Sequence, residues 1–496
     1  MSDLFKNYIA GQWVESSTGQ TFERRNPATG ELVGTYTKSG PEDVDRAVAA
    51  AKKAFQSWRL YPAPKRGELL FKVAHILDQR KEEFAREMTQ EMGKVIDEAR
   101  GDVQEAIDMA YYMAGEGRRM FGQTTPSEMR NKFQMSIRKP HGVCGIITPW
   151  NFPMAIPSWK IFPAIVTGNT VVFKPASFTS RMGLRFVEVL EEAGIPAGVV
   201  NLVLGDGKNV GDPLVEHPDV PVIGFTGSTE SGIDVSVRAA RKNKRVSLEM
   251  GGKNAVIVMD DADLDLAVEG ILWSAFGTSG QRCTAASRVI VHRSVQGELS
   301  ERLAARARKM VLGDGLDPKV DVGPVVSKRQ LESINEYVKI GASEGATLVT
   351  GGGIATTGLL EKGHFHEPTI FDNVTANMRI AQEEIFGPVV SLIPVDSLDE
   401  AIDVANGVQY GLSASIFTRN VNNAFRAMQD IFTGILYVNA GTTGAEIHLP
   451  FGGTKATGNG HREAGTAALD FFTEWQSLYI DYSGKLQRAQ IDEVAL

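Results

Sequence analysis

The pattern of apolar and polar positions along the chain predicts a change from β structure to helices and back. Residues 7–36 alternate short apolar runs with turn residues, which is typical of a β ribbon. From Pro41 the apolar residues recur at helical spacing, so we expect an amphipathic helix there and further helices over residues 64–92 and 95–116. Between residues 122 and 142 the period returns to two, and we expect a protruding strand with two sides.

From residue 142 onward, short apolar strands alternate with segments of helical length. This order is typical of an open parallel sheet with helices on its faces, and a second series of the same kind begins near residue 254. We therefore predict an α/β fold with two open parallel-sheet units and a small β projection. The expected strands are residues 143–147, 170–174, 199–204, 222–226 and 245–250 in the first unit, and 255–259, 288–292, 389–395 and 413–418 in the second.

Composition and charge narrow the class of protein. The 496 residues carry a net charge of −8 without a long basic run, which argues against a nucleic-acid-binding surface. No stretch approaches the roughly 18 apolar residues that cross a bilayer, and the amino terminus lacks the apolar core of a signal peptide. Two distant cysteines cannot form a disulfide framework, so we predict a cytoplasmic protein. From the charge and the lack of a long apolar stretch, we predict neither a nucleic-acid nor a membrane partner.

Cys283, one of the two cysteines, is the first candidate for chemistry. It lies within residues 276–292, where Gly277 and Gly280 break the preceding helix, so we expect an exposed loop before a strand. The neighbouring cation of Arg282 would favour the thiolate, which makes Cys283 a candidate nucleophile. On local sequence alone, a small buried residue without a chemical role is the alternative.

Three further candidates stand at or just after predicted strand ends, where ligands bind in parallel sheets. Lys174 can reach ribose or phosphate oxygens, although a solvated surface lysine is the alternative. Burial would raise the pKa of Glu249 toward that of a general base, although a structural ion pair is the alternative. Asn151, stiffened by flanking prolines, is a candidate oxyanion donor or an ordinary turn residue.

The glycine turn from Gly227 to Gly232 follows a strand and begins a helix, whose free N–H groups suit a phosphate. The turn lacks the Lys and Ser/Thr of a P-loop, because Ile233 and Asp234 stand there, so nucleoside triphosphate hydrolysis is disfavoured. The histidines at residues 364–367 have the wrong spacing for a helical zinc site, and we expect no catalytic metal.

Seven short motifs occur in order across residues 148–455: TPWNFP, FKPA, GFTGS, LEMGGKN, GQRC, EEIFGP and PFGGTK. Together they resemble the aldehyde dehydrogenase superfamily, and the likeness covers essentially the whole chain. The resemblance implies NAD(P)-dependent oxidation of an aldehyde to a carboxylic acid through a cysteine thiohemiacetal and thioester. It makes Cys283 the nucleophile, Asn151 with the Cys283 N–H the oxyanion hole, and Glu249 the base that activates water.

The resemblance also assigns residues that bind NAD or NADP. Ser177 departs from the glutamate that strictly NAD-selective relatives tend to carry, and a serine neither repels a 2′-phosphate nor grips the ribose. We therefore expect NADP to be accepted alongside NAD. The implied cofactor-binding residues are Trp150, Lys174, Ser177, Gly227, Ser228, Gly232, Gln330, Glu384 and Phe386.

The implied fold has a nucleotide-binding domain of residues 1–121 and 141–252 and a catalytic domain of residues 253–450. Residues 122–140 and 466–490 form an oligomerisation ribbon, because exposed edge strands of this kind usually pair with another subunit. We expect a homo-oligomer, either a dimer or a tetramer.

Substrate specificity depends most on Arg282, which stands where related semialdehyde dehydrogenases use an arginine to read a distal carboxylate. The loop of residues 441–453 resembles the anchor loop of the aminoadipate and oxoglutarate semialdehyde branches. Against this, Phe152, Trp159 and Phe451 would line a tunnel suited to uncharged aldehydes. We predict a carboxylate-bearing semialdehyde as the substrate, with a broad range of aliphatic and aromatic aldehydes as the alternative.

Two other roles compete with hydrolytic oxidation. Relatives that transfer the acyl group to coenzyme A generally lack the base, whereas Glu249 is present here. A non-catalytic relative of the same fold is disfavoured because Cys283, Glu249 and Asn151 are all intact.

Overall fold

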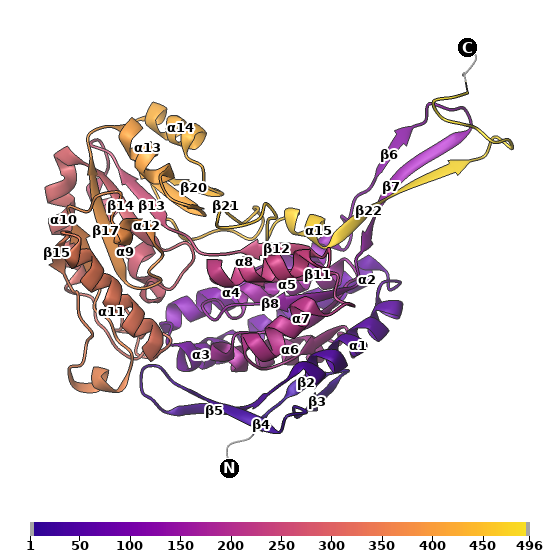
Figure 1. The fold of residues 1–496 in the computed structure, drawn as a ribbon, viewed down its shortest axis with the longest axis horizontal. Coiled ribbons are helices and arrows are strands. Elements are labelled where there is room, and N and C mark those ends of the chain that lie inside the picture. Colours follow the sequence, from indigo (N-terminus) through magenta and orange to yellow (C-terminus); the bar gives the residue numbers. More distant parts are fainter. Residues whose placement is uncertain (1–3, 493–496) are drawn as a thin grey trace.

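The computed structural model describes residues 4–492, which form two α/β units side by side and a long β arm that extends from one of them (Figure 1). Each unit is built on a seven-stranded sheet, and the arm is a three-stranded antiparallel sheet. The predicted α/β fold with two parallel-sheet units and a β projection is therefore confirmed.

The first sheet combines strands from the amino-terminal and middle parts of the chain. In spatial order they are β12 (Arg245–Glu249), β11 (Val222–Thr226), β8 (Val143–Ile147), β9 (Thr170–Lys174), β10 (Val200–Leu202), β2 (Asn7–Ile9) and β3 (Gln12–Val14). The first five are parallel, and β2 and β3 add an antiparallel edge. Pairing places Thr226 opposite Glu249 and Ile147 opposite Lys174, so the carboxyl ends of these strands lie at one edge of the sheet.

The second sheet is parallel except at one edge, where β15 pairs antiparallel with β16. In spatial order its strands are β15 (Thr347–Thr350), β16 (Thr369–Asp372), β17 (Val389–Val395), β14 (Ala286–His292), β13 (Asn254–Val258), β19 (Ser413–Phe417) and β20 (Ile435–Val438). The inner strands are apolar along most of their length because both of their faces are buried. The sequence pattern does not indicate β15, β16 and β20, which lie at or next to the edges.

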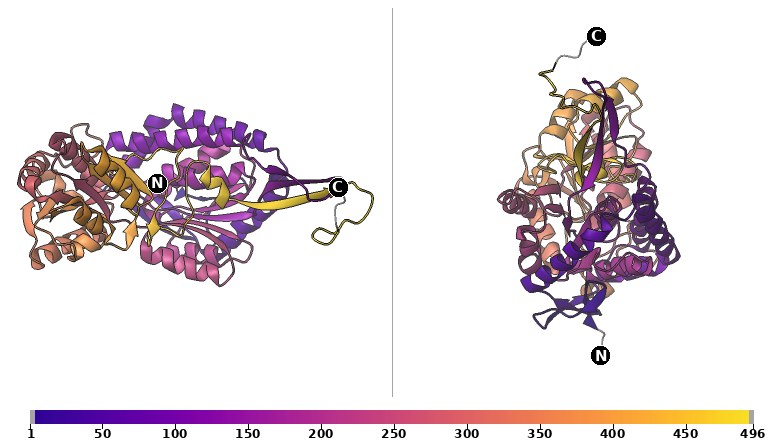
Figure 2. Two further views of the ribbon diagram at one scale, coloured as in Figure 1. Left: turned by 90° about the horizontal axis from the view of Figure 1, so that it is seen from above. Right: turned by 90° about the vertical axis from the view of Figure 1, so that its right-hand side faces the viewer.

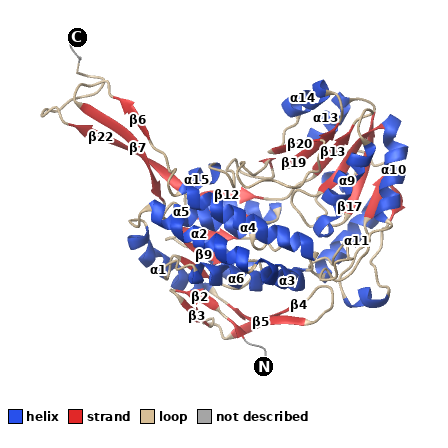
Figure 3. Ribbon diagram, turned by 180° about the vertical axis from the view of Figure 1, so that it is seen from behind, coloured by secondary structure: helices blue, strands red, loops and turns tan. Residues whose placement is uncertain are grey.

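Helices cover the two sheets (Figures 2 and 3). Those of the first unit are α1 (Pro41–Trp58), α2 (Ala63–Gln79), α3 (Lys81–Met92), α4 (Ile96–Glu116), α5 (Ala155–Val166), α6 (Ser180–Glu192), α7 (Asp212–Glu216), α8 (Thr229–Ala240) and α15 (Ala467–Phe471). Those of the second unit are α9 (Leu264–Phe276), α10 (Arg293–Ala307), α11 (Lys328–Ser343), α12 (Arg379–Gln382), α13 (Leu398–Asn406) and α14 (Val421–Asp430). Two small sheets complete the fold: β1 (Leu4–Phe5) with β5 (Leu32–Lys38) and β4 (Gln20–Arg25), and β18 (Tyr410–Gly411) with β21 (Thr454–Lys455).

The helical segment expected over residues 64–92 consists of two helices. Arg80 leaves the helical region, with φ −104° and ψ 12°, and separates α2 from α3. Apolar residues on both sides of Arg80 are buried at helical spacing, so the periodicity alone does not reveal the break. The helix expected over residues 95–116 is observed as α4.

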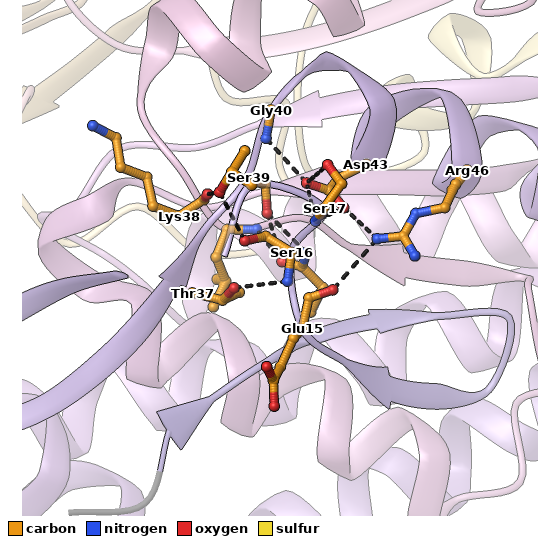
Figure 4. Close-up of polar contacts among 12 residues, drawn as sticks. Glu15, Ser16, Ser17, Thr37, Lys38, Ser39, Gly40, Asp43 and Arg46 are labelled. Carbon is orange, nitrogen blue, oxygen red and sulfur yellow. Dashed lines mark hydrogen bonds and ion pairs between the residues drawn. The ribbon is translucent and has the colours of Figure 1, made fainter. Parts of the chain in front are cut away.

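A buried aspartate fixes the start of α1, which the sequence places at Pro41 (Figure 4). Asp43 accepts a hydrogen bond from the Gly40 N–H at 3.0 Å and two more from the N–H and hydroxyl of Ser17 at 3.0 and 3.1 Å. It also forms an ion pair with Arg46. These contacts cap the first turn of α1 and tie it to the turn between β3 and β4.

The arm joins two segments that are far apart in the sequence (Figure 1). It contains β6 (Gln123–Pro126), β7 (Lys132–Pro140) and the carboxy-terminal strand β22 (Thr473–Asp481). Trp475 and Tyr479 on β22 are 48% and 65% exposed, so the arm presents aromatic side chains to its surroundings. Separately, no helix within residues 4–492 is long and apolar enough to cross a membrane.

Candidate active site

Two cavities meet at Cys283, near the carboxyl ends of the strands of the first sheet. The larger cavity has a volume of about 730 Å³, and the inner cavity has a volume of about 260 Å³. Both are lined by Ile156, Thr226, Met250 and Cys283, which therefore form the junction between them. A group in the larger cavity can approach a group in the inner cavity at the Cys283 thiol.

A strained loop brings Cys283 to this junction. The loop follows α9 through a short 3₁₀ turn (Gly277–Gly280), in which Thr278 and Ser279 have positive φ angles of 51° and 56°. Such backbone costs free energy unless neighbouring groups hold it. Glu98 does so by accepting hydrogen bonds from the N–H and hydroxyl of Thr278 at 2.7 and 2.6 Å. The expected exposed loop is wrong, because residues 277–282 are buried against these contacts.

Burial, followed by the negative charges of Glu384 and Glu249, raises the pKa of the Cys283 thiol to about 12. The N–H groups of Thr284 and Cys283 itself act in the opposite direction. Contrary to the sequence prediction, Arg282 does not hold the thiolate, because its guanidinium pairs with Glu98 at 3.0 Å. The resting thiol is therefore neutral at neutral pH.

Glu249 lies at the end of β12 and lines the inner cavity. Its carboxyl is buried, and neither oxygen has a hydrogen-bond partner within the described part of the chain. Burial and then the charge of Glu463 raise the pKa of Glu249 well above the usual carboxyl value, against the opposing charges of Lys160 and Arg462. A buried carboxyl with a raised pKa suits a group that takes up and releases a proton near neutral pH.

A buried ion pair lies beside Glu249. Lys160 of α5 pairs with Glu463, and both side chains are almost completely excluded from solvent. Glu463 also lines the inner cavity, where its backbone exchanges two hydrogen bonds of 2.7 Å with Phe451. This pair fixes one positive and one negative charge close to the Glu249 carboxyl, and both act on its pKa.

Asn151 follows β8 and lines the larger cavity. Its buried side chain donates a hydrogen bond from Nδ2 to the Gln281 carbonyl at 3.1 Å. An amide nitrogen carries two hydrogens, so the second N–H remains available. Because Gln281 precedes Cys283 by two positions, this amide lies against the loop that carries the thiol. A fixed N–H donor in such a place can stabilise an oxyanion.

The larger cavity brings together seven of the nine predicted cofactor residues. Ser228 caps α8 by accepting a hydrogen bond from the Ser231 N–H at 3.3 Å, so the start of this helix faces the cavity. Burial lowers the pKa of Lys174 to about 8, and burial raises that of Glu384 to about 7. The seven residues are Trp150, Lys174, Gly227, Ser228, Gln330, Glu384 and Phe386.

The other two predicted cofactor residues, Ser177 and Gly232, line neither cavity. Ser177 donates a hydrogen bond from Oγ to the Gly205 carbonyl at 3.0 Å. Gly232 lies in the first turn of α8, where a Cβ atom would overlap the Met250 sulfur. Its lack of a side chain therefore allows α8 to pack closely against the end of β12.

The four predicted substrate residues, Arg282, Phe152, Trp159 and Phe451, all line the inner cavity. Trp159 and Phe451 are in ring contact, with centroids 4.6 Å apart. Arg282 pairs with Glu98 through Nη2 and donates from Nε to the Thr278 hydroxyl at 3.0 Å. Its Nη1 has no hydrogen-bond partner among residues 4–492.

The sequence analysis does not identify four charged residues that lie in or next to the inner cavity: Glu98, Glu105, Lys160 and Glu463. Glu98 and Glu105 lie seven positions apart on α4, with Asp102 between them. This spacing places all three on one helix face. Three acidic residues spaced as on one face of a helix are therefore the sequence signal from which this wall of the cavity could have been predicted.

Other features add no chemistry. Within residues 4–492, no cluster of three His, Cys, Asp or Glu side chains is suited to holding a metal ion. A thiol at the junction of two cavities, with a buried carboxyl in the inner cavity and an amide donor in the larger one, provides the groups that acyl chemistry on a cysteine requires.

The raised pKa predicts slow and strongly pH-dependent alkylation of Cys283. Only the thiolate reacts, so the rate constant with iodoacetamide should rise about tenfold per pH unit between pH 7 and 9.5. Mass spectrometry of the peptide that contains Cys283 measures this rate. The Cys283→Ser variant retains only the fully buried Cys144 and should stay unmodified. A rate that levels off below pH 8 would contradict the assignment of a neutral resting thiol.

Comparisons with known proteins show the family of the chain. The family model described as "Aldehyde dehydrogenase family" matches residues 13–478. The chain is 45% identical over 479 residues to alpha-ketoglutaric semialdehyde dehydrogenase of Bacillus subtilis (strain 168), with 96% of this chain and 98% of that protein covered. It is 42% identical to malonate-semialdehyde dehydrogenase 2 of Geobacillus kaustophilus, with 94% and 96% covered.

The solved structures extend this similarity to the whole fold. The structure of betaine aldehyde dehydrogenase from Staphylococcus aureus in complex with NAD+ matches with a TM-score of 0.95 at 34% identity, and 99% of this chain and 97% of that chain are covered. The chain belongs to the aldehyde dehydrogenase family, and it is an enzyme that oxidises aldehydes.

Proposed function

We propose that this enzyme oxidises semialdehydes that carry a distal carboxylate, with a nicotinamide cofactor, and releases the dicarboxylic acid. The observation that carries the proposal is the place of Arg282, the cation among the residues that line the inner cavity, directly next to Cys283 in the chain. The names of similar proteins, which include alpha-ketoglutaric and malonate semialdehyde dehydrogenases, support the same class of substrate.

The proposed reaction begins at Cys283. After the thiol loses its proton, Sγ bonds to the aldehyde carbon, and the aldehyde oxygen gains a negative charge. The Asn151 amide and the Cys283 N–H donate hydrogen bonds to that oxygen, and these bonds are strongest when the charge is fully developed. Because the resting thiol is neutral, this proton must pass to water before Sγ attacks the aldehyde.

The larger cavity fits a nicotinamide dinucleotide. The start of α8 offers free N–H groups to a diphosphate, and Lys174 offers an amine near a ribose. The buried Thr226 hydroxyl, in the wall of the cavity, has no partner within the described residues. When bound, the cofactor supplies the hydride acceptor, and the Cys283 adduct becomes a thioester. Trp150, Gln330, Glu384 and Phe386 would hold the nicotinamide end near Cys283.

Glu249 is the proposed base for the second stage. It takes a proton from a water molecule, whose oxygen then bonds to the thioester carbon and displaces the Cys283 thiolate. Because the pKa of Glu249 is raised, its carboxyl must ionise first, and the Lys160 charge favours the ionised form. The presence of this base favours hydrolysis over transfer of the acyl group to coenzyme A. A broad range of uncharged aldehydes remains the alternative, and the aromatic walls of the inner cavity favour it.

We further propose that the arm formed by β6, β7 and β22 joins copies of the chain into a dimer or tetramer, and that the two sheets mark separate nucleotide-binding and catalytic domains. Exposed aromatic residues on the edge strand β22 support the first proposal. The gathering of cofactor residues at the ends of the first sheet supports the second. A cytoplasmic location stays a prediction from the sequence.

The place of Arg282 predicts a loss that is specific to charged substrates. Arg282→Ala should lower kcat/KM for succinic semialdehyde by roughly 10- to 100-fold, the range expected for one hydrogen-bonded charge. It should change kcat/KM for butanal, which has the same chain length without the carboxylate, by less than about threefold. Steady-state assays of NADH formation measure both values.

Because Arg282→Ala leaves Glu98 buried without its cation, the double variant Arg282→Ala, Glu98→Gln is the matched control. It should show the same selective loss as Arg282→Ala. An unchanged kcat/KM for the semialdehyde in both variants would refute the proposal that Arg282 binds the distal carboxylate of the substrate.

The identity of residue 177 predicts the cofactor range. No carboxylate at this position repels a 2′-phosphate, so kcat/KM with NADP+ should lie within a factor of about 100 of the value with NAD+. Ser177→Glu should increase the preference for NAD+ at least about tenfold by charge repulsion. Ser177→Gln adds similar bulk without charge and serves as the control. A wild-type preference for NAD+ above a hundredfold would show the hypothesis to be wrong.

A further inference from the structure

The acidic face of α4 forms part of the wall of the inner cavity. Glu98, Asp102 and Glu105 all line this cavity. Two of the three acids have a cation of their own. Glu98 pairs with Arg282 at 3.0 Å, and Asp102 pairs with Lys94 at 2.9 Å while accepting the N–H groups of Met154 and Ala155.

Glu105 differs from its two neighbours on α4. Its carboxyl has no hydrogen bond and no ion pair with any residue in the described part of the chain. The side chain is half-buried and lines the cavity, so it is available to a bound molecule. The cations of Lys94 and Arg282 are already neutralised by Asp102 and Glu98, which leaves Glu105 without a counter-ion of its own.

Several polar groups around Glu105 lack partners as well. The Thr443 hydroxyl is buried, unpaired within residues 4–492 and part of a residue that lines the same cavity. Arg282 Nη1 also has no partner there. The Tyr437 hydroxyl of β20 is buried without a partner, and the charge of Glu105 contributes to the raised pKa of this tyrosine, after the larger effect of burial. The Thr443 hydroxyl and Arg282 Nη1 are therefore unsatisfied donors of residues that line the cavity, whereas Tyr437 lies outside its lining.

We propose that Glu105 is a specificity-determining residue: as a neutral carboxylic acid it donates a hydrogen bond to the distal carboxylate of the substrate beside Arg282, and once ionised it repels that carboxylate. This inference rests on the proposed function, because it needs a substrate with a distal anion. A protonated carboxyl is a donor of the kind that an anionic ligand requires. An ionised Glu105 would place two carboxylates together in a site where Arg282 Nη1 is the unpaired guanidinium nitrogen.

The charges that surround Glu105 agree with a neutral form at neutral pH. Burial, followed by the charge of Asp102, raises the pKa of Glu105 to about 8; Asp108 adds a smaller increase, whereas Lys94 and Arg282 lower it. The group is thus neutral below about pH 8 and ionised above it. Asp102, Asp108 and Glu98 lie on the same helix as Glu105, Lys94 and Arg282 lie on loops, and Tyr437 lies on β20.

The inference predicts that selectivity for a distal carboxylate is lost as pH rises. From a pKa of about 8, roughly nine-tenths of Glu105 is neutral at pH 7 and roughly one-tenth at pH 9, so the carboxylate-specific advantage should fall about tenfold. The measured quantity is the ratio of kcat/KM for succinic semialdehyde to that for butanal between pH 6.5 and 9.5. Taking the ratio cancels the titration of Cys283 and Glu249, which both substrates share.

Two variants at residue 105 separate the roles of the proton and the side chain. Glu105→Gln keeps a donor that does not titrate, so its ratio should stay near the wild-type value at pH 7 and should not change with pH. Glu105→Leu removes the donor, so its ratio should be at least about fivefold lower at pH 7 and should also be independent of pH. Turnover of butanal shows that each variant is folded.

The control is Asp108→Asn, an exposed position one turn further along α4 that lines neither cavity. It should keep the fall in the ratio with pH, moved to a slightly lower pH because the Asp108 charge contributes to the raised pKa of Glu105. A high ratio that is independent of pH in the wild type, or a wild-type pH dependence in Glu105→Gln, would overturn the role of Glu105 alone. A ratio near one at every pH would overturn both this role and the proposed function.

Discussion

The contacts of Glu98 with the loop before Cys283 are the constraint on which the site depends. The Glu98 carboxylate accepts hydrogen bonds from the N–H and the hydroxyl of Thr278 and also forms an ion pair with Arg282. The same interaction therefore holds a strained backbone, sets the position of the thiol and orients the guanidinium. Because Glu98 belongs to the first unit and Cys283 lies between strands of the second, it also connects the two halves of the fold. One buried cluster consequently places both Cys283 and Arg282, the proposed nucleophile and the proposed substrate-binding residue.

Burial governs the chemistry of the remaining groups. It is the largest cause of the raised pKa values of Cys283, Glu249, Glu384 and Glu105. A neutral thiol is protected from adventitious reaction, and a neutral carboxyl costs less free energy to bury than an ionised one. The reaction that we propose needs Cys283 and Glu249 to ionise in turn, so the site must stabilise each charge only when it is used. The Lys160 charge favours the ionised form of Glu249, and the Asn151 amide is a fixed donor beside the loop that carries Cys283.

The sequence predicts the interior of the two sheets well and the charged walls of the site poorly. Strands such as β8, β9, β11 and β17 are recognised because uninterrupted apolar runs bounded by turns are typical of buried parallel strands. The glycine-rich stretch before Cys283 is misjudged as exposed, because the same residues permit both open turns and close buried approach. Contacts such as Glu98 with Thr278 and Lys160 with Glu463 join positions 180 and 303 residues apart, and no local pattern marks them. The role of Glu105 is still harder to predict, because this residue is distinguished by the lack of a hydrogen-bond or ion-pair partner within the described residues.

The most direct test of the central claim is to trap the acyl intermediate on Cys283. A Glu249→Gln variant, mixed with NAD+ and succinic semialdehyde and quenched with acid, is digested and analysed by mass spectrometry. We expect about one NADH per active site, followed by very slow turnover, and an adduct on the peptide with Cys283 equal in mass to the aldehyde less two hydrogen atoms. Turnover at the wild-type rate, with Cys283 unmodified throughout, would contradict the account.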